Sequence, residues 1–107
     1  MTIQKIDDNF AQSPQLQPDD IRQIAEAGYK GIVCARPDHE DPGQPTFAQI
    51  AEAAERFGLK AFHIPVSGRL TEGQLIRFEQ ARAETDGPLL GYCRSGGRAG
   101  SLYAATL

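Results

Sequence analysis

One short stretch near the end of the chain combines a cysteine, two glycines and two arginines. Cys93 follows an apolar run at positions 88–92, and Arg98 comes after it with four residues between them, including Gly96 and Gly97. Glycines allow the close approaches and positive φ angles that turn successive backbone N–H groups toward one point, and the start of a helix adds a partial positive charge. A cysteine in such a field is stabilised as the thiolate. The stretch therefore predicts a nucleophile, Cys93, beside an anion-binding cation, Arg98.

The other residues of this stretch are predicted to bind the substrate. Arg94 points either toward an anionic substrate or into solvent, and Ser95 either hydrogen-bonds the thiolate or caps the following helix. The simpler alternative makes Cys93 a small buried residue at a strand end and the glycines an ordinary turn. A cysteine, glycines and a closing arginine at one strand–helix junction favour the functional interpretation. The set assigned to substrate binding is Arg94, Ser95, Gly96, Gly97 and Ala99.

A regular alternation of helix and strand signals must position this stretch. Helices are expected over about nine residues from position 18, and after two Thr-x-x-Gln capping boxes that begin at Thr46 and Thr71. Continuous apolar runs predict strands at 31–35, 60–64 and 88–92. Residues 1–18 carry weak signals, enough only for a short edge strand that includes Phe10. The pattern predicts an α/β fold, a mainly parallel sheet of about four to five strands flanked by helices.

Two further loops are expected to reach the same place as the cysteine. Residues 36–45 and 65–70 each follow a predicted parallel strand, and the carboxyl ends of such strands share one edge of the sheet. Asp38, His39 and Arg69 are therefore candidate crevice contacts, although each also fits an exposed loop residue. Cys34, in the middle of a strand, is expected to pack in the core, and His63 to make a hydrogen bond behind the site.

Length and charge limit the classes of protein to consider. The 107 residues, 40% of them hydrophobic, fit one domain over 1–107, and a net charge of −3 gives no general attraction to nucleic acid or an anionic membrane. No apolar run approaches the roughly 20 residues of a membrane span, and no signal-peptide order opens the chain, so we expect a cytoplasmic protein with free thiols. With two cysteines, two histidines and no Cys-x-x-Cys, neither a metal nor another cofactor is expected.

The residues from Tyr92 to Arg98 resemble the active loop of rhodanese-type sulfurtransferases, in which a cysteine and an arginine enclose four residues. Protein tyrosine and dual-specificity phosphatases are similar but enclose five, and here Ala99 stands where their arginine would be. Together with segments 32–37 and 58–66, the loop resembles the beta-lactamase-hydrolase-like family of small bacterial proteins. This resemblance implies a protein-tyrosine-phosphatase-like fold with a rhodanese-like loop. Its members occur alone or fused to persulfide-handling domains in sulfide metabolism.

The absence of a general acid near the loop favours sulfur chemistry. Dual-specificity phosphatases, which the chain resembles, carry an aspartic general acid a few residues beyond an isoleucine-proline pair like Ile64-Pro65. Residues 66–70 of this chain contain no carboxylate. Proton transfer by such an acid is worth about 10²–10⁴-fold in rate. We therefore expect a sulfurtransferase that moves a sulfane sulfur through a Cys93 persulfide to a thiol or cyanide. The alternatives are a cysteine-dependent phosphatase and a non-catalytic anion- or thiol-sensing module. The expected partners are a small anionic sulfur or phosphate substrate and a persulfide-handling protein. Because the chain stops at Leu107, about two turns into its last helix, we expect it either to be a fragment cut short at the C-terminus or to be completed by a partner or a further C-terminal segment.

Overall fold

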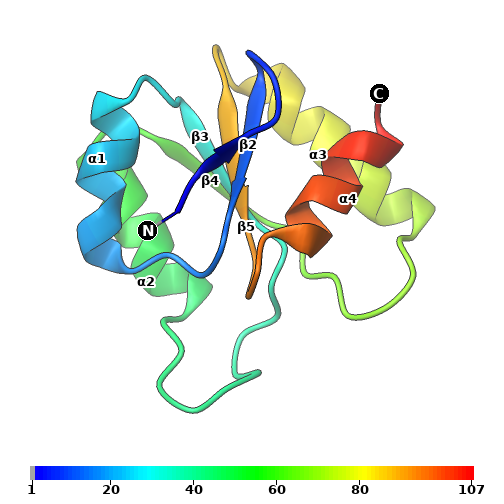
Figure 1. The fold of residues 1–107 in the computed structure, drawn as a ribbon, viewed down its shortest axis with the longest axis horizontal. Helices are drawn as coiled ribbons and strands as arrows, with labels where there is room; N and C mark the ends of the chain where they lie inside the picture. The colour runs from blue at the N-terminus through cyan, green and yellow to red at the C-terminus, as the bar shows by residue number, and fades with distance from the viewer. Residues whose placement is uncertain (1) are drawn as a thin grey trace.

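The computed structural model describes residues 2–107 and consists of a five-stranded sheet between two layers of helices. The strands lie in the order β1-β2-β5-β3-β4, and all neighbours are parallel except β1 and β2 (Figure 1). The predicted α/β architecture is confirmed. The strands are β1 (Gln4–Lys5), β2 (Phe10–Ser13), β3 (Gly31–Cys34), β4 (Lys60–His63) and β5 (Leu89–Tyr92). The helices are the 3-10 turn η1 (Pro18–Asp20), α1 (Ile21–Glu26), α2 (Phe47–Arg56), α3 (Glu72–Glu84) and α4 (Gly97–Ala105).

The two predicted capping boxes set where α2 and α3 begin. The side chain of Thr46 accepts from the backbone N–H of Gln49, whose own side chain accepts from the Thr46 N–H. Thr71 and Gln74 form the same pair at the start of α3. Each box satisfies two backbone donors that a helix start leaves free, which fixes the lengths of the loops before these helices.

Two apolar clusters occupy the two faces of the sheet. Alternate residues of β3 point to opposite sides: Ile32 and Cys34 pack with α1 and α2, whereas Val33 packs with α3 and α4. Figure 1 shows α1 and α2 on one side of the sheet and α3 and α4 on the other. Helices on both faces explain why the parallel strands carry continuous apolar runs rather than an alternating pattern.

The strand β2 differs from what the sequence predicts. The sequence predicts at most a short edge strand before residue 18. Two strands form there, and of these two β1 lies at an edge of the sheet whereas β2 lies inside it. Phe10 and Ala11 lie within β2, in parallel register with Leu89 and Leu90 of β5. The four-residue segment Phe-Ala-Gln-Ser is too short and too polar to signal a buried strand by its pattern, and its place depends on pairing with β5.

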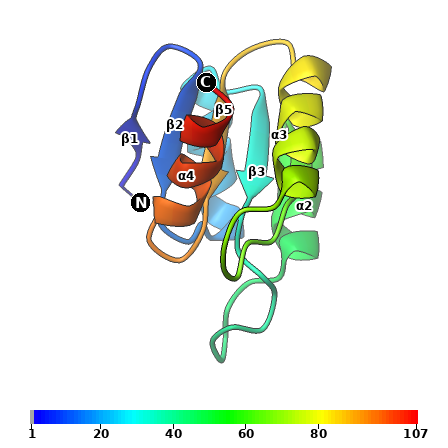
Figure 2. The same cartoon turned by 90° about the vertical axis from the view of Figure 1, so that its right-hand side faces the viewer.

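The loops that follow β3, β4 and β5, which hold the predicted site residues, all lie at one edge of the sheet. The segments that follow β3, β4 and β5 leave from the carboxyl ends of these strands, and the loop between β3 and α2 extends furthest from the sheet (Figure 2). This is the edge at which open α/β sheets bind ligands. Within residues 2–107, no helix has the length and apolar character needed to cross a membrane.

Candidate active site

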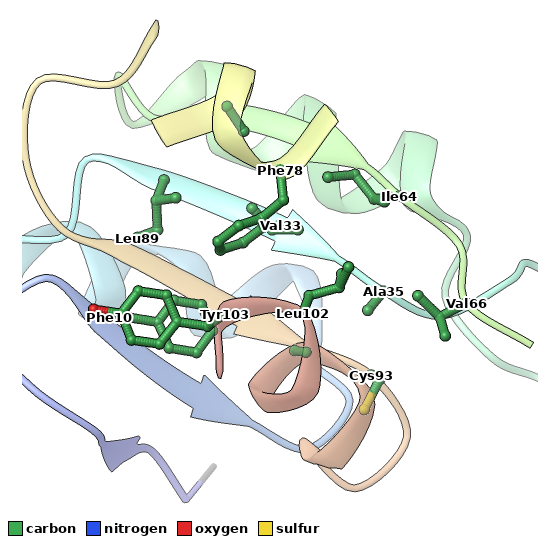
Figure 3. Packing of buried hydrophobic residues seen from close by; sticks show 12 residues of the cluster. Phe10, Val33, Ala35, Ile64, Val66, Phe78, Leu89, Cys93, Leu102 and Tyr103 are labelled. Carbon is green, nitrogen blue, oxygen red and sulfur yellow. The ribbon is translucent and has the colours of Figure 1, made fainter. Parts of the chain in front are cut away.

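Cys93 lies directly after β5, where the chain turns into α4. The residue is 1% exposed, and it belongs to the apolar cluster on the α3 and α4 side, near Ala35 and Val66 (Figure 3). Its backbone N–H donates to the carbonyl of Ser13 at 3.4 Å, so β2 holds the first residue of the loop. Its Sγ accepts a hydrogen bond from the N–H of Gly96 at 3.0 Å. The sulfur thus faces into the loop that follows it.

Opposing influences act on the Cys93 thiol. The largest single influence is burial, which raises the pKa of Cys93 because it disfavours the charged form. The backbone N–H groups of Ala99, Arg98, Ser95 and Gly96 all act in the other direction, and together they hold the pKa of Cys93 below its ordinary value. These donors belong to the loop and the first turn of α4, as the glycine pattern predicts. The arrangement stabilises a thiolate in a site screened from water.

Gly96 gives the loop its shape. Its φ is +102°, a conformation that residues with a side chain rarely adopt, and it is the N-cap of α4. A Cβ at this position would lie 3.4 Å from the Ser13 backbone, so the loop also passes close to β2. Because Gly96 is the N-cap and no side chain caps the helix, the suggestion that Ser95 caps it is wrong. The helix begins at Gly97.

Arg98 makes a two-pronged ion pair with Glu40, which comes from the long loop between β3 and α2. Arg98 Nη1 donates to Glu40 Oε2 at 2.7 Å, and Nη2 donates to Oε1 at 2.8 Å. Nη1 also donates to the carbonyl of Val66 at 2.8 Å. Glu40 is the main cause that raises the pKa of Arg98, and the neighbouring Cys93 sulfur adds to it. The guanidinium thus connects the cysteine loop to the loops that follow β3 and β4.

Arg36, at the end of β3, holds Glu40 from the other side. It is 3% exposed, and its three nitrogens donate to Glu40 Oε1 at 2.9 Å, Gln15 Oε1 at 2.8 Å and Asp41 Oδ2 at 2.6 Å. Glu40 thus lies between two guanidinium groups. Hydrogen bonding to Arg98 first, and to Arg36 next, outweighs desolvation and lowers the pKa of Glu40 from 4.5 to about 2. A carboxylate with such a pKa is ionised throughout the neutral range.

The sequence analysis did not single out Arg36 or Glu40. A signal was present: an arginine directly after a buried strand run, with acidic residues four and five positions later. A buried arginine needs such partners. The pattern could have identified Arg36 as an anchor, but not its connection to Arg98, because that contact joins residues 58 positions apart.

The other predicted site residues lie at the same edge of the sheet but have different contacts. Arg94 is exposed, with Nε 3.5 Å from Asp41 Oδ2. Asp38 accepts from the N–H of Phe47 at 2.8 Å and so holds the start of α2. His39, with a φ of +65°, and Arg69 are both exposed. Among the contacts of residues 2–107, none joins His39 or Arg69 to the cysteine loop.

Two nearby groups have structural roles, as predicted. Cys34 points to the opposite face of the sheet from Cys93, packs with α1 and α2, and donates to the carbonyl of Arg36 at 3.3 Å. Burial raises the pKa of its thiol. His63 Nε2 lies 2.8 Å from the same carbonyl, and its ring stacks on Phe47 with centroids 4.7 Å apart. Both cysteines are free, and within the described part of the chain no group of three or more acidic, histidine or cysteine residues is placed to hold a metal ion.

A mainly parallel sheet whose last strand is followed by a cysteine, a loop of inward N–H groups and a helix is the architecture of a protein-tyrosine-phosphatase-like domain. Solved structures agree. A candidate phosphatase from Neisseria meningitidis Z2491 superposes with a TM-score of 0.84 at 41% identity, over 96% of this chain and 74% of that one. The phosphatase Tk-PTP superposes with a TM-score of 0.71 at 23% identity, over 98% and 71% of the two chains, which shows the shared fold.

The family follows from the sequence comparison. The family model "Beta-lactamase hydrolase-like protein, phosphatase-like domain" matches residues 2–106, and the chain belongs to this family. A beta-lactamase hydrolase-like protein of Xylella fastidiosa Temecula1 is 40% identical over 105 residues, which cover 97% of this chain and 24% of that protein. The protein of the same name from Agrobacterium fabrum is 42% identical over 85 residues, or 78% of this chain and 20% of that protein. The chain therefore spans about a quarter or less of these curated relatives.

Proposed function

We propose that this domain hydrolyses phosphate monoesters through a phosphocysteine on Cys93. The observation that carries the proposal is the Cys93 sulfur, set among the N–H groups of its loop with a lowered pKa and with Arg98 beside it. The phosphatase-like family and fold support it, and they suggest a small phosphate-type substrate. These findings favour phosphate chemistry, the alternative in the sequence analysis, over the sulfur transfer predicted first.

The reaction needs two displacements at phosphorus. The Cys93 thiolate attacks the phosphorus, an S–P bond forms, and the P–O bond to the leaving alcohol or phenol breaks with its electron pair on oxygen. Loop N–H groups and the Arg98 guanidinium stabilise the charge on the phosphoryl oxygens. Water then attacks the phosphocysteine, a new P–O bond forms and the S–P bond breaks with its electron pair on sulfur. Inorganic phosphate leaves with both protons of the water, and the thiolate is regenerated. The thiolate must stay reduced, so the proposal places the domain in a reducing compartment such as the cytoplasm.

The substrate class follows from the charge of the nearby carboxyl groups. Residues 66–70 hold no carboxyl group. In the loop after β3, Asp38 and Asp41 accept hydrogen bonds from the Phe47 N–H and from Arg36, and Glu40, which reaches Arg98, is ionised and cannot donate a proton to a leaving oxygen at neutral pH. Without a general acid, the leaving group must depart as an anion. We therefore propose aryl phosphates, whose phenolates are stable, as the substrates, with a rate that falls steeply as the pKa of the phenol rises.

The experiment measures hydrolysis of a series of substituted phenyl phosphates by the chain, by Cys93→Ser and by the control Cys34→Ser. We expect turnover by the wild type and by Cys34→Ser, none by Cys93→Ser, and one phosphoryl group on Cys93 after a rapid acid quench, seen by intact mass. A chain that leaves p-nitrophenyl phosphate intact and gains no phosphoryl group would contradict the proposal.

Sulfur transfer stays a second candidate because of the spacing in the loop. Four residues separate Cys93 from Arg98, and Ala99 stands where the five-residue spacing of phosphatases would place the arginine. Transfer of a persulfide sulfur needs no general acid. Incubation with thiosulfate or glutathione persulfide, followed by intact mass, tests it: a gain of one sulfur that Cys93→Ser abolishes favours this candidate and a persulfide-handling partner. Binding of phosphate or sulfate without either reaction would favour the sensing module.

A further inference from the structure

The two edges of the Arg98 guanidinium are used differently. An arginine side chain carries five N–H bonds: one on Nε and two on each terminal nitrogen. Glu40 occupies the edge formed by Nη1 and Nη2, and the carbonyl of Val66 takes the second hydrogen of Nη1. The hydrogens that remain are those of Nε and the second one of Nη2, and they share the other edge. Among residues 2–107, Glu40 and Val66 are the hydrogen-bond partners of the two terminal nitrogens, and neither lies on that edge; the Cys93 sulfur is close enough to the guanidinium to help raise the pKa of Arg98.

The free edge is a fork suited to an oxyanion. Two parallel N–H donors on one guanidinium bind two oxygens of a phosphate or similar anion at once, and this arrangement is both stronger and more directional than a single bond. The fork belongs to Arg98, which closes the loop that Cys93 opens, and the Cys93 sulfur faces into this loop through its hydrogen bond from the Gly96 N–H. The same sulfur helps to raise the pKa of Arg98. An anion held by it would therefore lie beside the nucleophile.

Glu40 is itself held in place. Its Oε1 lies between Arg98 Nη2, at 2.8 Å, and Arg36 Nε, at 2.9 Å. Arg36 is buried and bonded to Gln15, whose backbone N–H donates to the carbonyl of Arg94 at 3.3 Å. The contacts thus form a ring that leaves the cysteine loop at Arg98 and returns to it at Arg94. A rigid ring of this kind fixes the plane of the Arg98 guanidinium.

We propose that Glu40, anchored by buried Arg36, is a positioning residue that turns the Nε–Nη2 edge of Arg98 toward the phosphoryl oxygens of the substrate. The inference rests on the proposed anion chemistry at Cys93 and adds a requirement to it. The same contacts also define the opposite role, in which the Glu40 carboxylate competes with the substrate for Arg98. The two roles predict changes of opposite sign when Glu40 is altered.

The test compares Glu40→Gln, Glu40→Asp and the control Glu52→Gln, which removes the same charge from an exposed pair with Arg56 on α2. Calorimetry measures the binding of tungstate, an unreactive oxyanion, and steady-state kinetics measures kcat and KM for p-nitrophenyl phosphate. Losing one charged hydrogen bond is worth about tenfold. We expect both Glu40 variants to bind tungstate about tenfold more weakly and to lose kcat as well as kcat/KM, with Glu52→Gln unchanged. Glu40→Asp keeps the charge but is too short to bridge both arginines, so it separates geometry from charge.

Several results would overturn the proposal. Tighter tungstate binding and a lower KM in Glu40→Gln would show a competitor, and unchanged binding in both variants would show that the ring does not position Arg98. The melting temperature and the rate of Cys93 alkylation by neutral iodoacetamide check that the loop is intact. If tungstate binding by the variants falls as expected but the wild type hydrolyses no aryl phosphate, the positioning role stands and the proposed hydrolase function fails. A wild type that binds no tungstate contradicts both.

Discussion

Gly96 allows the backbone geometry of the loop to be tested apart from its side chains. Gly96→Ala places a Cβ on a residue with a φ of +102°, which costs about 1–2 kcal/mol of folding free energy for an L-amino acid. The new methyl group lies 3.4 Å from the Ser13 backbone, so contact adds little to this cost. We expect the variant to relieve the strain by rotating its peptide, which moves the N–H away from the Cys93 sulfur that it approaches at 3.0 Å.

The loss of that hydrogen bond sets the size of the functional effect. A hydrogen bond to a charged group is worth about 1.5–3 kcal/mol, so the thiolate population at a pH below the pKa of Cys93 falls about tenfold or more. The assay is the ultraviolet absorbance of the thiolate as a function of pH, in a Cys34→Ser background so that Cys93 alone titrates. We expect the titration of Gly96→Ala to move to higher pH, and the hydrolysis of aryl phosphate below that pH to fall in the same proportion.

Gly28→Ala is the matched control. Gly28 has a φ of +98°, nearly that of Gly96, but nothing lies within 4 Å of its Cβ position, and it ends α1 away from the cysteine. Urea unfolding is therefore expected to show a similar loss of stability in both variants, with a shifted thiolate titration only in Gly96→Ala. If Gly96→Ala loses stability but titrates as the parent chain does, the Gly96 N–H does not stabilise the thiolate, and the reasoning is refuted.

Three further predictions concern stability. Glu40→Gln should lose about 1 kcal/mol of unfolding free energy, the upper range for a partly exposed ion pair. Because the pKa of Glu40 is lowered from 4.5 to about 2 in the folded protein, urea unfolding should show the whole difference from wild type above pH 4.5 and none once the pH has fallen below about 2. Tyr92→Phe removes a buried hydroxyl without a hydrogen-bond partner among the described residues, so calorimetry should show unchanged or higher stability, by up to about 1 kcal/mol; a clear loss would reveal a missed partner. Phe10→Ala should cost about 3–5 kcal/mol in the same assay, since Phe10 is buried and stacks on Tyr103 at 4.3 Å; a loss below about 1 kcal/mol would show that β2 is peripheral.

Local signals explain why most of the fold could be predicted. The Thr46 and Thr71 boxes and the apolar runs of β3 and β5 depend on residues a few positions apart, and each of these elements begins or ends within about a residue or two of its expected limit. The strand β2 could not be found in this way. Its segment has few apolar residues, and it becomes a strand because β5 supplies the hydrogen-bond partners for Phe10 through Ser13.

The candidate site also combines features that local sequence signals predict with features that depend on contacts between distant segments. Cys93, Gly96 and the N–H groups after them act within one loop, so their spacing in the sequence was enough to predict a stabilised thiolate. The role of Arg98 depends on more than its distance in sequence from the cysteine. Glu40 and Arg36 decide which of its N–H groups are free, and they arrive from a loop whose path follows from the burial of Arg36 against Gln15 and Asp41.

The same contacts change how the missing acid should be interpreted. The absence of a carboxylate at residues 66–70 favours sulfur chemistry, yet Glu40 brings a carboxylate to Arg98 from another loop. Its two arginine partners keep it ionised, so it supplies charge and orientation rather than a proton. A site with an oriented arginine and no proton donor is suited to substrates whose leaving group needs no acid. Both aryl phosphates and persulfides meet that condition. The leaving-group series and the thiosulfate experiment therefore separate the two chemistries more sharply than the loop spacing can.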